Sequence, residues 1–465
     1  MQGEQTMGSR EEIARRADKA RTVTESLSAH GVRAVALSQV DNAGVTRVKT
    51  VPVSLLERAV KYGIGMSPVF EVFMVNDSIT SSDEVGGPVG DLRLMPDPWA
   101  LKVLAAQTGW AWAPVDKHTQ EGEVYPGCQR TFAKRQMARA ADAGIEIRMA
   151  FELEWFQAGA DSEVEHPIHT GPAYGLPVLA TISDYARDLI VALEEGGVGL
   201  DQFHPEYARG QLEVSVPPAD PVGAADTTVL VRQTIRAVAA THGMRASFSP
   251  VVIAGDVGNG GHVHFSLWRD GVNLFAGGQG PYGMTDIGEA FVAGVLAQLP
   301  ALVAVGSPSV PSYLRLIPSH WAGAFQCWGR ENREAAIRFV TGMVGTRETA
   351  ANTEVKCFDQ SANPYLAAGA LIAAGLAGME RDLRLPDEVT VDPGALSDAE
   401  LARTGVQRLP QSLDEALSNL EKSDVLRDAM GPMLFGPFTA VRRAEAEAFA
   451  GLDPGEIVAA HRWRY

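Results

Sequence analysis

Hydrophobic and polar residues alternate strictly along residues 145–155, and this pattern predicts a β-strand with two unlike faces. The odd-numbered positions are all apolar, whereas the even-numbered positions include Glu152 and Glu154. Successive side chains of a strand point to opposite faces, so the two carboxylates would lie side by side. Neighbouring carboxylates repel each other where water is scarce and favour a bound cation, although an ordinary strand with one solvated face has the same pattern.

A second alternating segment, residues 261–268, places His262, His264 and Ser266 on one predicted face. A period of two directs both imidazoles the same way. Such a pair is more often two satisfied surface histidines than a site. The glycine-rich stretch before it, residues 255–261, matches neither the P-loop nor the dinucleotide fingerprint and is typical of a flexible turn.

Two further segments contain charged residues that could lie close together. Glu206 and Glu213 stand at the two ends of a short polar segment, and a strand predicted at residues 353–358 places Glu354 and Lys356 on one face. Each of these patterns is weak evidence alone.

Arginines gather between these segments, at Arg315, Arg330, Arg333 and Arg338, and apolar residues separate them. A guanidinium group binds phosphate or carboxylate through two parallel hydrogen bonds. A solvated basic helix or turn would contain the same residues, so both interpretations stay open at this level.

Turn-rich, short apolar segments in residues 1–118 predict a small mixed domain, and residues 119–465 predict a larger one with strong strands and long helices. The predicted helices are residues 130–143, 182–195, 222–242, 365–379 and 412–430. Residues 385–410 lack a clear period and predict a long surface loop.

Composition narrows the class of protein. The hydrophobic fraction of 46% and the charged fraction of 21% are typical of a globular protein. A net charge of -17 opposes binding to nucleic acid or to anionic membranes. The apolar run at residues 365–379 is too short to span a bilayer. Three widely spaced cysteines without CxxC spacing favour the reducing cytoplasm.

Taken together, the motifs resemble those of glutamine synthetase in order and spacing. The resemblance rests on the segments Phe151-Glu-Leu-Glu154, Gly210-Gln-Leu-Glu213, His262-Val-His-Phe-Ser-Leu-Trp268, Asn332-Arg-Glu-Ala-Ala-Ile-Arg338 and Ser361-Ala-Asn-Pro-Tyr365. It implies an α+β fold, with a small β-grasp-like domain at residues 1–118 and a catalytic α/β domain with a curved antiparallel sheet at residues 119–465.

The resemblance also implies an acidic site for two divalent cations. One ion would be held by Glu154, Glu206 and Glu213, and the other by Glu152, His262 and Glu354. Carboxylates with a single imidazole favour Mg²⁺ or Mn²⁺ over zinc.

The remaining motif residues would then bind ATP and glutamate. By the same resemblance, Arg333 and Arg338 hold the transferring phosphates, and His264 and Ser266 contact the nucleotide. Glutamate would contact Arg315, Gly258 and Lys356, the last of which replaces an arginine of the family. The γ-carboxyl group of glutamate becomes reactive only after phosphorylation, so an acyl phosphate intermediate is expected.

The chain departs from the family in the predicted ammonium pocket. Ser67 stands where the family has an aspartate that deprotonates ammonium, and Trp321 stands where a flap glutamate is expected. Tyr174 and Glu206 of that pocket remain. Without the two carboxylates, ammonia should be a poor substrate, and a small organic amine should replace it.

The bulk of Trp321 and the hydroxyl group of Ser67 favour a short monoamine with a polar tail, so ethanolamine is the first expectation. Polyamines such as putrescine are the alternative, which Glu71 near the same loop would support. A plain glutamine synthetase comes next, and a catalytically silent scaffold last.

Members of this family assemble as two stacked hexameric rings. The resemblance therefore implies a homo-oligomer, a dodecamer in which the first domain of one subunit closes the catalytic domain of the next.

Overall fold

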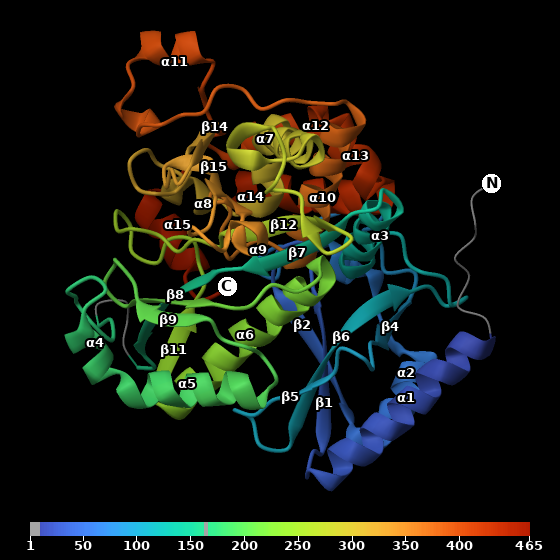
Figure 1. Ribbon diagram of the computed structural model, residues 1–465. Coiled ribbons are helices and arrows are strands. Elements are labelled where there is room, and N and C mark those ends of the chain that lie inside the picture. The colour runs from blue at the N-terminus through green and yellow to red at the C-terminus, as the bar shows by residue number, and fades with distance from the viewer. Residues whose placement is uncertain (1–9, 162–165) are drawn as a thin grey trace.

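The computed structural model describes residues 10–161 and 166–465. Its first sheet is formed by β1 (Ala34–Val40), β2 (Thr46–Pro52), β3 (Ile64–Met66), β4 (Leu92–Pro96), β5 (Lys102–Val103) and β6 (Trp110–His118). The order is β2-β1-β6-β4-β3, β5 pairs with β6, and only β1 and β6 run parallel. Two helices, α1 (Arg10–Ala29) and α2 (Leu56–Tyr62), lie beside it (Figure 1).

Two further sheets make up the larger part of the molecule. The four-stranded sheet has the order β11 (Met244–Ser247), β8 (Leu153–Gly159), β10 (Gln211–Ser215) and β9 (Gln202–Pro205). The seven-stranded sheet has the order β13 (Val272–Asn273), β12 (Val263–Arg269), β16 (Asn352–Val355), β15 (Ala335–Val340), β14 (Phe325–Arg330) and β17 (Gln407–Arg408), and β7 (Glu146–Phe151) also pairs with β12.

The predicted fold class, a small β-grasp-like domain followed by a larger α/β catalytic domain, is confirmed. The catalytic strands pair antiparallel except for β14 and β15, which run parallel. All strands of the first sheet lie before residue 119. The exact division at residue 118 remains a prediction.

The single strand predicted at residues 145–155 is wrong in one respect. The chain forms β7 and then β8, which belong to different sheets, with Glu152 between them. The alternation continues through the junction because both strands bury their apolar faces, so periodicity alone does not reveal the change of sheet. Glu152 consequently stands where the two catalytic sheets meet.

Helices cover the sheets and fill the core. The longer ones are α3 (Gln129–Asp142), α5 (Ser183–Glu195), α6 (Pro221–Thr241), α7 (Asp286–Gly306), α10 (Pro364–Glu380), α12 (Leu413–Lys422) and α14 (Pro432–Ala448). The shorter ones are α4 (Leu176–Thr181), α8 (Ser312–Arg315), α9 (Arg347–Ala350), α11 (Asp398–Thr404), α13 (Asp424–Met430) and α15 (Pro454–His461).

Two sequence predictions outside the site need correction. The helix predicted at residues 412–430 is two helices, because Ser423 ends α12 and its hydroxyl group accepts a hydrogen bond from the N–H of Leu426, which starts α13. The loop predicted at residues 385–410 contains α11 and β17. Both elements are short, so no clear apolar period marks them.

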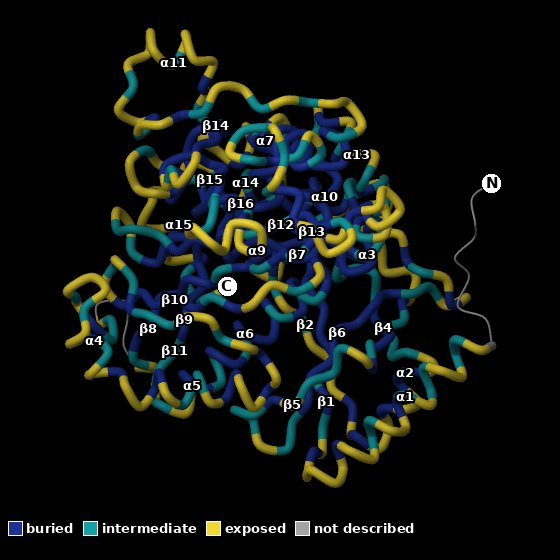
Figure 2. The backbone as a smooth tube through the Cα atoms, in the orientation of Figure 1, coloured by how far each residue is buried: buried dark blue, intermediate teal, exposed yellow. Residues whose placement is uncertain are grey.

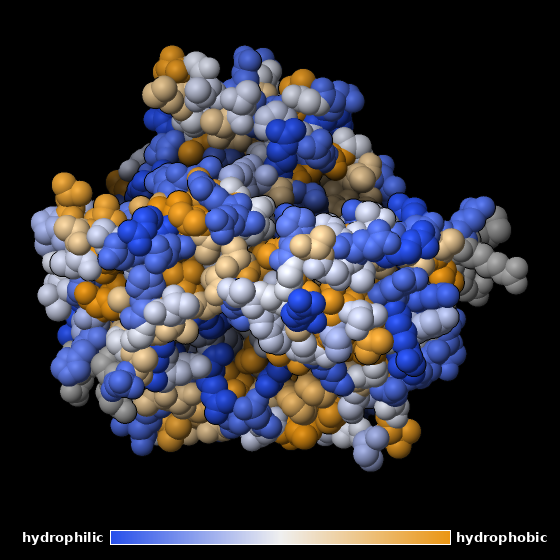
Figure 3. Space-filling model, turned by 90° about the horizontal axis from the view of Figure 1, so that it is seen from below, coloured by the Kyte–Doolittle hydropathy of each residue, from blue (hydrophilic) through white to orange (hydrophobic). Residues whose placement is uncertain are grey.

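The core lies around α7 and α10, and α10 is buried along nearly its whole length (Figure 2). The two helices cross closely, because a Cβ atom on Gly294 would lie 2.6 Å from the Cα of Gly378. By length and composition α7 could span a membrane, but 78% of its most apolar window is buried inside the molecule. It is therefore a core helix. On the face seen from below, hydrophilic and hydrophobic residues are interspersed (Figure 3).

Candidate active site

A cavity of about 1020 Å³ opens where the two catalytic sheets meet, and residues from β8, β9, β10, β12, β15 and β16 line it. Five glutamates and four histidines reach it, together with Arg315, Arg333, Arg338 and Lys356. Most of the site residues predicted from sequence therefore share one cavity. Ser67 and Ser266 are outside its lining.

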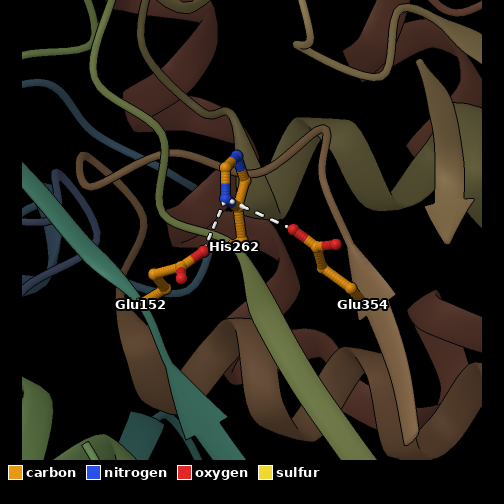
Figure 4. A group of neighbouring side chains, drawn as sticks. All are labelled: Glu152, His262 and Glu354. Atoms are coloured by element: carbon orange, nitrogen blue, oxygen red, sulfur yellow. Dashed lines mark hydrogen bonds and ion pairs between the residues drawn. The ribbon is translucent and has the colours of Figure 1, made fainter. Parts of the chain in front are cut away.

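One acidic group joins Glu152, His262 and Glu354, whose ligand atoms all lie within 4.8 Å of one another (Figure 4). The Nδ1 atom of His262 is 2.9 Å from Oε2 of Glu152 and 3.4 Å from Oε1 of Glu354. The three side chains come from the β7–β8 junction, the start of β12 and β16. They converge because β12 pairs with both β7 and β16.

A second group joins His204, Glu206 and Glu213. The Nε2 atom of His204 is 3.1 Å from Oε1 of Glu206 and 3.6 Å from Oε1 of Glu213. The sequence motifs do not single out His204, because it matters only through its partner strand, where it stands directly opposite Glu213. Its place two residues before Glu206, at a strand period, is the one local signal that points to it.

Glu154 lies between the two groups. It is directly opposite Glu213 on the neighbouring strand, and its Oε1 atom is 3.8 Å from Nδ1 of His262. Its Oε2 atom accepts hydrogen bonds from the N–H of Gly260 at 2.7 Å and from Nε2 of Gln211 at 2.8 Å. These bonds fix the carboxylate at the centre of the acidic floor.

The charges of the floor are not balanced by the protein alone. Burial and the neighbouring carboxylates of Glu152 and Glu154 raise the pKa of Glu213 to about 12. Burial also opposes ionisation of Glu354, but Lys356, His264 and His262 outweigh it and lower its pKa to about 2. Holding all of these carboxyl groups ionised at neutral pH requires added positive charge.

The donor set fits divalent cations. Carboxylate oxygens with one imidazole in each group are ligands that Mg²⁺ and Mn²⁺ accept, whereas structural zinc sites use thiolates and more imidazoles. The two convergent acidic groups, and the position of Glu154 directly opposite Glu213, support this fit. The assignment of each side chain to a particular ion remains a prediction.

Cationic side chains face this floor. Arg338 donates from Nη1 to Oε2 of Glu354 at 3.1 Å and from Nη2 to Glu331 at 3.0 Å. Arg333 is exposed and lines the cavity without an ion pair among the residues described. Arg333 is thus available to bind an anionic ligand, whereas Arg338 is already oriented by two carboxylates.

Arg315 and Lys356 occupy the buried side of the cavity. Arg315 is 6% exposed, its Nη2 atom is 3.2 Å from Nε2 of His262, and its Nη1 atom has no partner among the described residues. Lys356 donates to Glu354 at 3.2 Å. Gly258 leaves room beside this arginine, because a Cβ atom there would lie 2.2 Å from the carbonyl oxygen of Pro250 and 3.1 Å from Cγ of Arg315.

Of the two residues predicted to contact the nucleotide, only His264 lines the cavity. Its Nδ1 atom is 2.9 Å from Oδ1 of Asn352. Ser266 is farther along β12, and its hydroxyl oxygen accepts a hydrogen bond from Trp268 at 2.8 Å. Ser266 is thus placed beyond the rim of the cavity.

Aromatic residues form the outer wall of the cavity. The hydroxyl group of Tyr174 donates to Glu206 at 2.7 Å, and its ring stacks on His204 at 5.7 Å between ring centroids. Trp321 is 52% exposed and meets Tyr207 edge to face at 5.6 Å. A hydrogen bond of 2.6 Å from the N–H of Trp321 to Glu334 holds the backbone of this loop.

The first domain does not deliver Ser67 to this cavity within one chain. Ser67 caps a 3-10 helix, where its hydroxyl oxygen accepts from the N–H of Val69 at 3.3 Å. Glu71, expected to help a polyamine bind, is 1% exposed and forms an ion pair with the buried Lys117. Its carboxylate is therefore a structural group, and that expectation is wrong.

Known proteins resemble this chain in sequence over most of its length. Residues 126–455 match the model of the glutamine synthetase catalytic domain, and residues 19–121 match that of the glutamine synthetase N-terminal domain. A gamma-glutamylpolyamine synthetase of Streptomyces coelicolor is 53% identical over 96% of this chain and 97% of its own length. A glutamine synthetase of Halobacterium salinarum is 32% identical over 92% of this chain and 93% of its own.

Solved structures of related proteins have the same fold. A glutamine synthase homologue superimposes with a TM-score of 0.83 at 33% identity, over 93% of this chain and 99% of that chain. A complex of GmaS with ADP has a TM-score of 0.81 at 28% identity, over 93% of this chain and 97% of that chain. The acidic cavity, the fold and these matches together show that the chain belongs to the glutamine synthetase family.

Proposed function

We propose that this protein joins the γ-carboxyl group of glutamate to an amino group of a polyamine, at the expense of ATP. Its membership of the glutamine synthetase family makes it an acid–amine ligase, and members of that family use ATP and divalent cations. The observation that carries the proposal is the composition of the 1020 Å³ cavity, which combines two acidic groups, several guanidinium groups and an aromatic outer wall.

The cavity provides for phosphoryl transfer at its floor. Divalent cations bound by Glu152, His262 and Glu354 and by His204, Glu206 and Glu213 would neutralise phosphate charge. Arg333 and Arg338 would hold the phosphates, and Arg315 the glutamate. An oxygen of the γ-carboxylate attacks the γ-phosphorus of ATP, the bond to the bridging oxygen breaks, and ADP leaves with γ-glutamyl phosphate remaining.

The second step forms the amide bond. The unprotonated amine nitrogen attacks the acyl carbon, the carbon–oxygen bond to phosphate breaks, and the proton that the nitrogen loses is balanced by protonation of the released phosphate. Tyr174 and Glu206 line the side from which the amine would enter. We assign them the role of orienting the incoming nitrogen, and Tyr207 with Trp321 that of excluding water from the acyl phosphate.

The choice of amine rests on the cavity and on the relative. The cavity also contains Asp201 and Asp256; Asp256 is neutralised by Arg209 at 2.7 Å, whereas Asp201 forms no ion pair among the described residues. Such a carboxylate suits the second ammonium group of a polyamine and has no partner in ethanolamine. The relative named for polyamines supports the same choice, so the comparisons favour the alternative over our first expectation, ethanolamine.

Two further alternatives have less support. A plain glutamine synthetase would need to bind ammonium with Tyr174 and Glu206 and without the carboxylate that Trp321 replaces. A catalytically inactive protein would not require the two convergent acidic groups. The proposal includes a dodecamer of two stacked hexamers, in which Ser67 of one subunit would approach the cavity of its neighbour.

An isotope experiment tests the chemistry. Glutamate labelled with ¹⁸O in its γ-carboxyl group is incubated with ATP, Mg²⁺ and spermine, and the released phosphate is analysed by mass spectrometry. The acyl phosphate route transfers one labelled oxygen to phosphate for each amide formed. Amide formation accompanied by unlabelled phosphate would refute it.

A further inference from the structure

A second cavity, of about 620 Å³, lies in the first domain and is strongly acidic. The loop before β4, the residues after β6, Pro68, Tyr125 and Met433 of α14 line it. Four lining residues carry carboxylates: Asp83, Glu84, Asp91 and Glu121. Among the lining residues that the structure describes, none is lysine, arginine or histidine.

The charges of these carboxylates are not neutralised by neighbouring cations of the described chain. Asp91 accepts a hydrogen bond of 2.5 Å from Gln120, and within residues 10–161 and 166–465 none of the four is part of an ion pair. Glu84 reaches over α14 at Gly436, where a Cβ atom would clash with its carboxylate. Four carboxylates therefore surround this cavity, and Gly436 leaves space for that of Glu84.

A buried hydroxyl group also lacks a partner here. Tyr125 lines the cavity, is only 5% exposed, and its hydroxyl oxygen has no hydrogen-bond partner among the described residues. A buried phenol normally finds a partner, because leaving the hydrogen bond unmade costs free energy. A ligand in the cavity that donates a hydrogen bond would satisfy it.

We propose that this cavity, which is distinct from the 1020 Å³ cavity of the same chain, binds an organic polyammonium ion. A divalent metal needs several oxygens converging on one point, and none of these four carboxylates is part of a convergent group in the described chain. Spread-out carboxylates instead match the spaced ammonium groups of an extended chain. Apolar residues between them, such as Val85, Leu92 and Met433, suit its methylene segments.

The cavity wall is continuous with the loop that holds Ser67. A Cβ atom on Gly65 would lie 3.3 Å from the Asp91 carboxylate, and one on Gly90 would lie 3.3 Å from Pro68. A bound polyammonium ion would therefore contact this loop and fix its position. Because the loop is predicted to close a catalytic cavity, occupancy of the second site would tune the amine step.

The test is equilibrium dialysis of labelled spermine against the full-length protein, with Mg²⁺ at millimolar concentration and without ATP or glutamate. Asp83→Asn/Glu84→Gln should weaken one class of binding site by about tenfold. Tyr125→Phe should weaken it by about threefold and leave the melting temperature nearly unchanged, because the hydroxyl group has no partner within the described protein.

Glu194→Gln/Glu195→Gln removes the same charge from the exposed end of α5, outside both cavities, and should leave binding unchanged. Equal weakening by this control would show nonspecific attraction and overturn the proposal. Loss of all spermine binding when Mg²⁺ is present, or binding that the first two variants do not alter, would overturn it as well. Since no turnover is measured, failure here is distinct from failure of the proposed reaction.

Discussion

Removal of the Glu71 carboxylate should destabilise the first domain, because this buried group holds the fold together and does not line the catalytic cavity. Glu71 and Lys117 are each 1% exposed and form an ion pair. Gln129 accepts from Lys117 at 2.7 Å and donates to Glu71 at 2.9 Å. Glu71→Gln leaves a buried ammonium group without its counter-charge, a change that costs about 3–5 kcal/mol.

Hydrogen exchange measures this cost where it arises. At ~1.4 kcal/mol per tenfold change, the amides of β6, which carries Lys117, should exchange at least about 100-fold faster in the variant. The double variant Glu71→Gln/Lys117→Met removes the stranded charge and should recover much of the protection. Because Glu71 does not contact the substrate, the KM for spermine should change far less than the protection of β6.

If Glu71→Gln left β6 protection intact and raised the KM for spermine, Glu71 would be a substrate contact and the buried ion pair would not exist in solution.

Further predictions concern pH, metal binding and specificity. Burial lowers the pKa of His461 to about 4, whereas an unfolded histidine titrates near ~6.5. The contribution of this histidine to stability is therefore complete above pH ~6.5 and falls by about 2 kcal/mol on going to pH 5, because mainly the unfolded chain takes up the proton. The variant His461→Phe should lose less melting temperature over this interval. His204→Ala should weaken Mn²⁺ binding by about 10- to 100-fold in a calorimetric titration, and unchanged affinity would remove it from the ligand set. Trp321→Glu restores a carboxylate to the outer wall, and kcat/KM for ammonium should rise relative to spermine; a fall for both amines would assign Trp321 a purely structural role.

Strand periodicity marks Glu152, His262 and Glu354 as candidates, because a period of two places polar side chains on one face of an otherwise apolar strand. The resemblance to a family is what selects them as a metal site. The fold brings the three together through pairing of β12 with its two neighbours. Which strands pair is a long-range property, and the resemblance to a family supplies it.

His204 and Glu71 show what the sequence leaves out. His204 gains its role from its register opposite Glu213, and the one local sign of it is its place two residues before Glu206. Glu71 has the pattern of an available carboxylate, and only the packing around Lys117 shows that it is buried. The change of sheet at Glu152 is hidden for a related reason, since two buried strands in succession alternate like one long strand.

A competition experiment among amines tests whether the cavity joins glutamate to a polyamine. The protein is given ATP, Mg²⁺ and glutamate with equal concentrations of ammonium, ethanolamine, putrescine, spermidine and spermine, and the products are quantified by mass. We expect γ-glutamyl adducts of one or more polyamines, with glutamine and γ-glutamylethanolamide near background. Predominant formation of glutamine or γ-glutamylethanolamide would show that the cavity does not select polyamines.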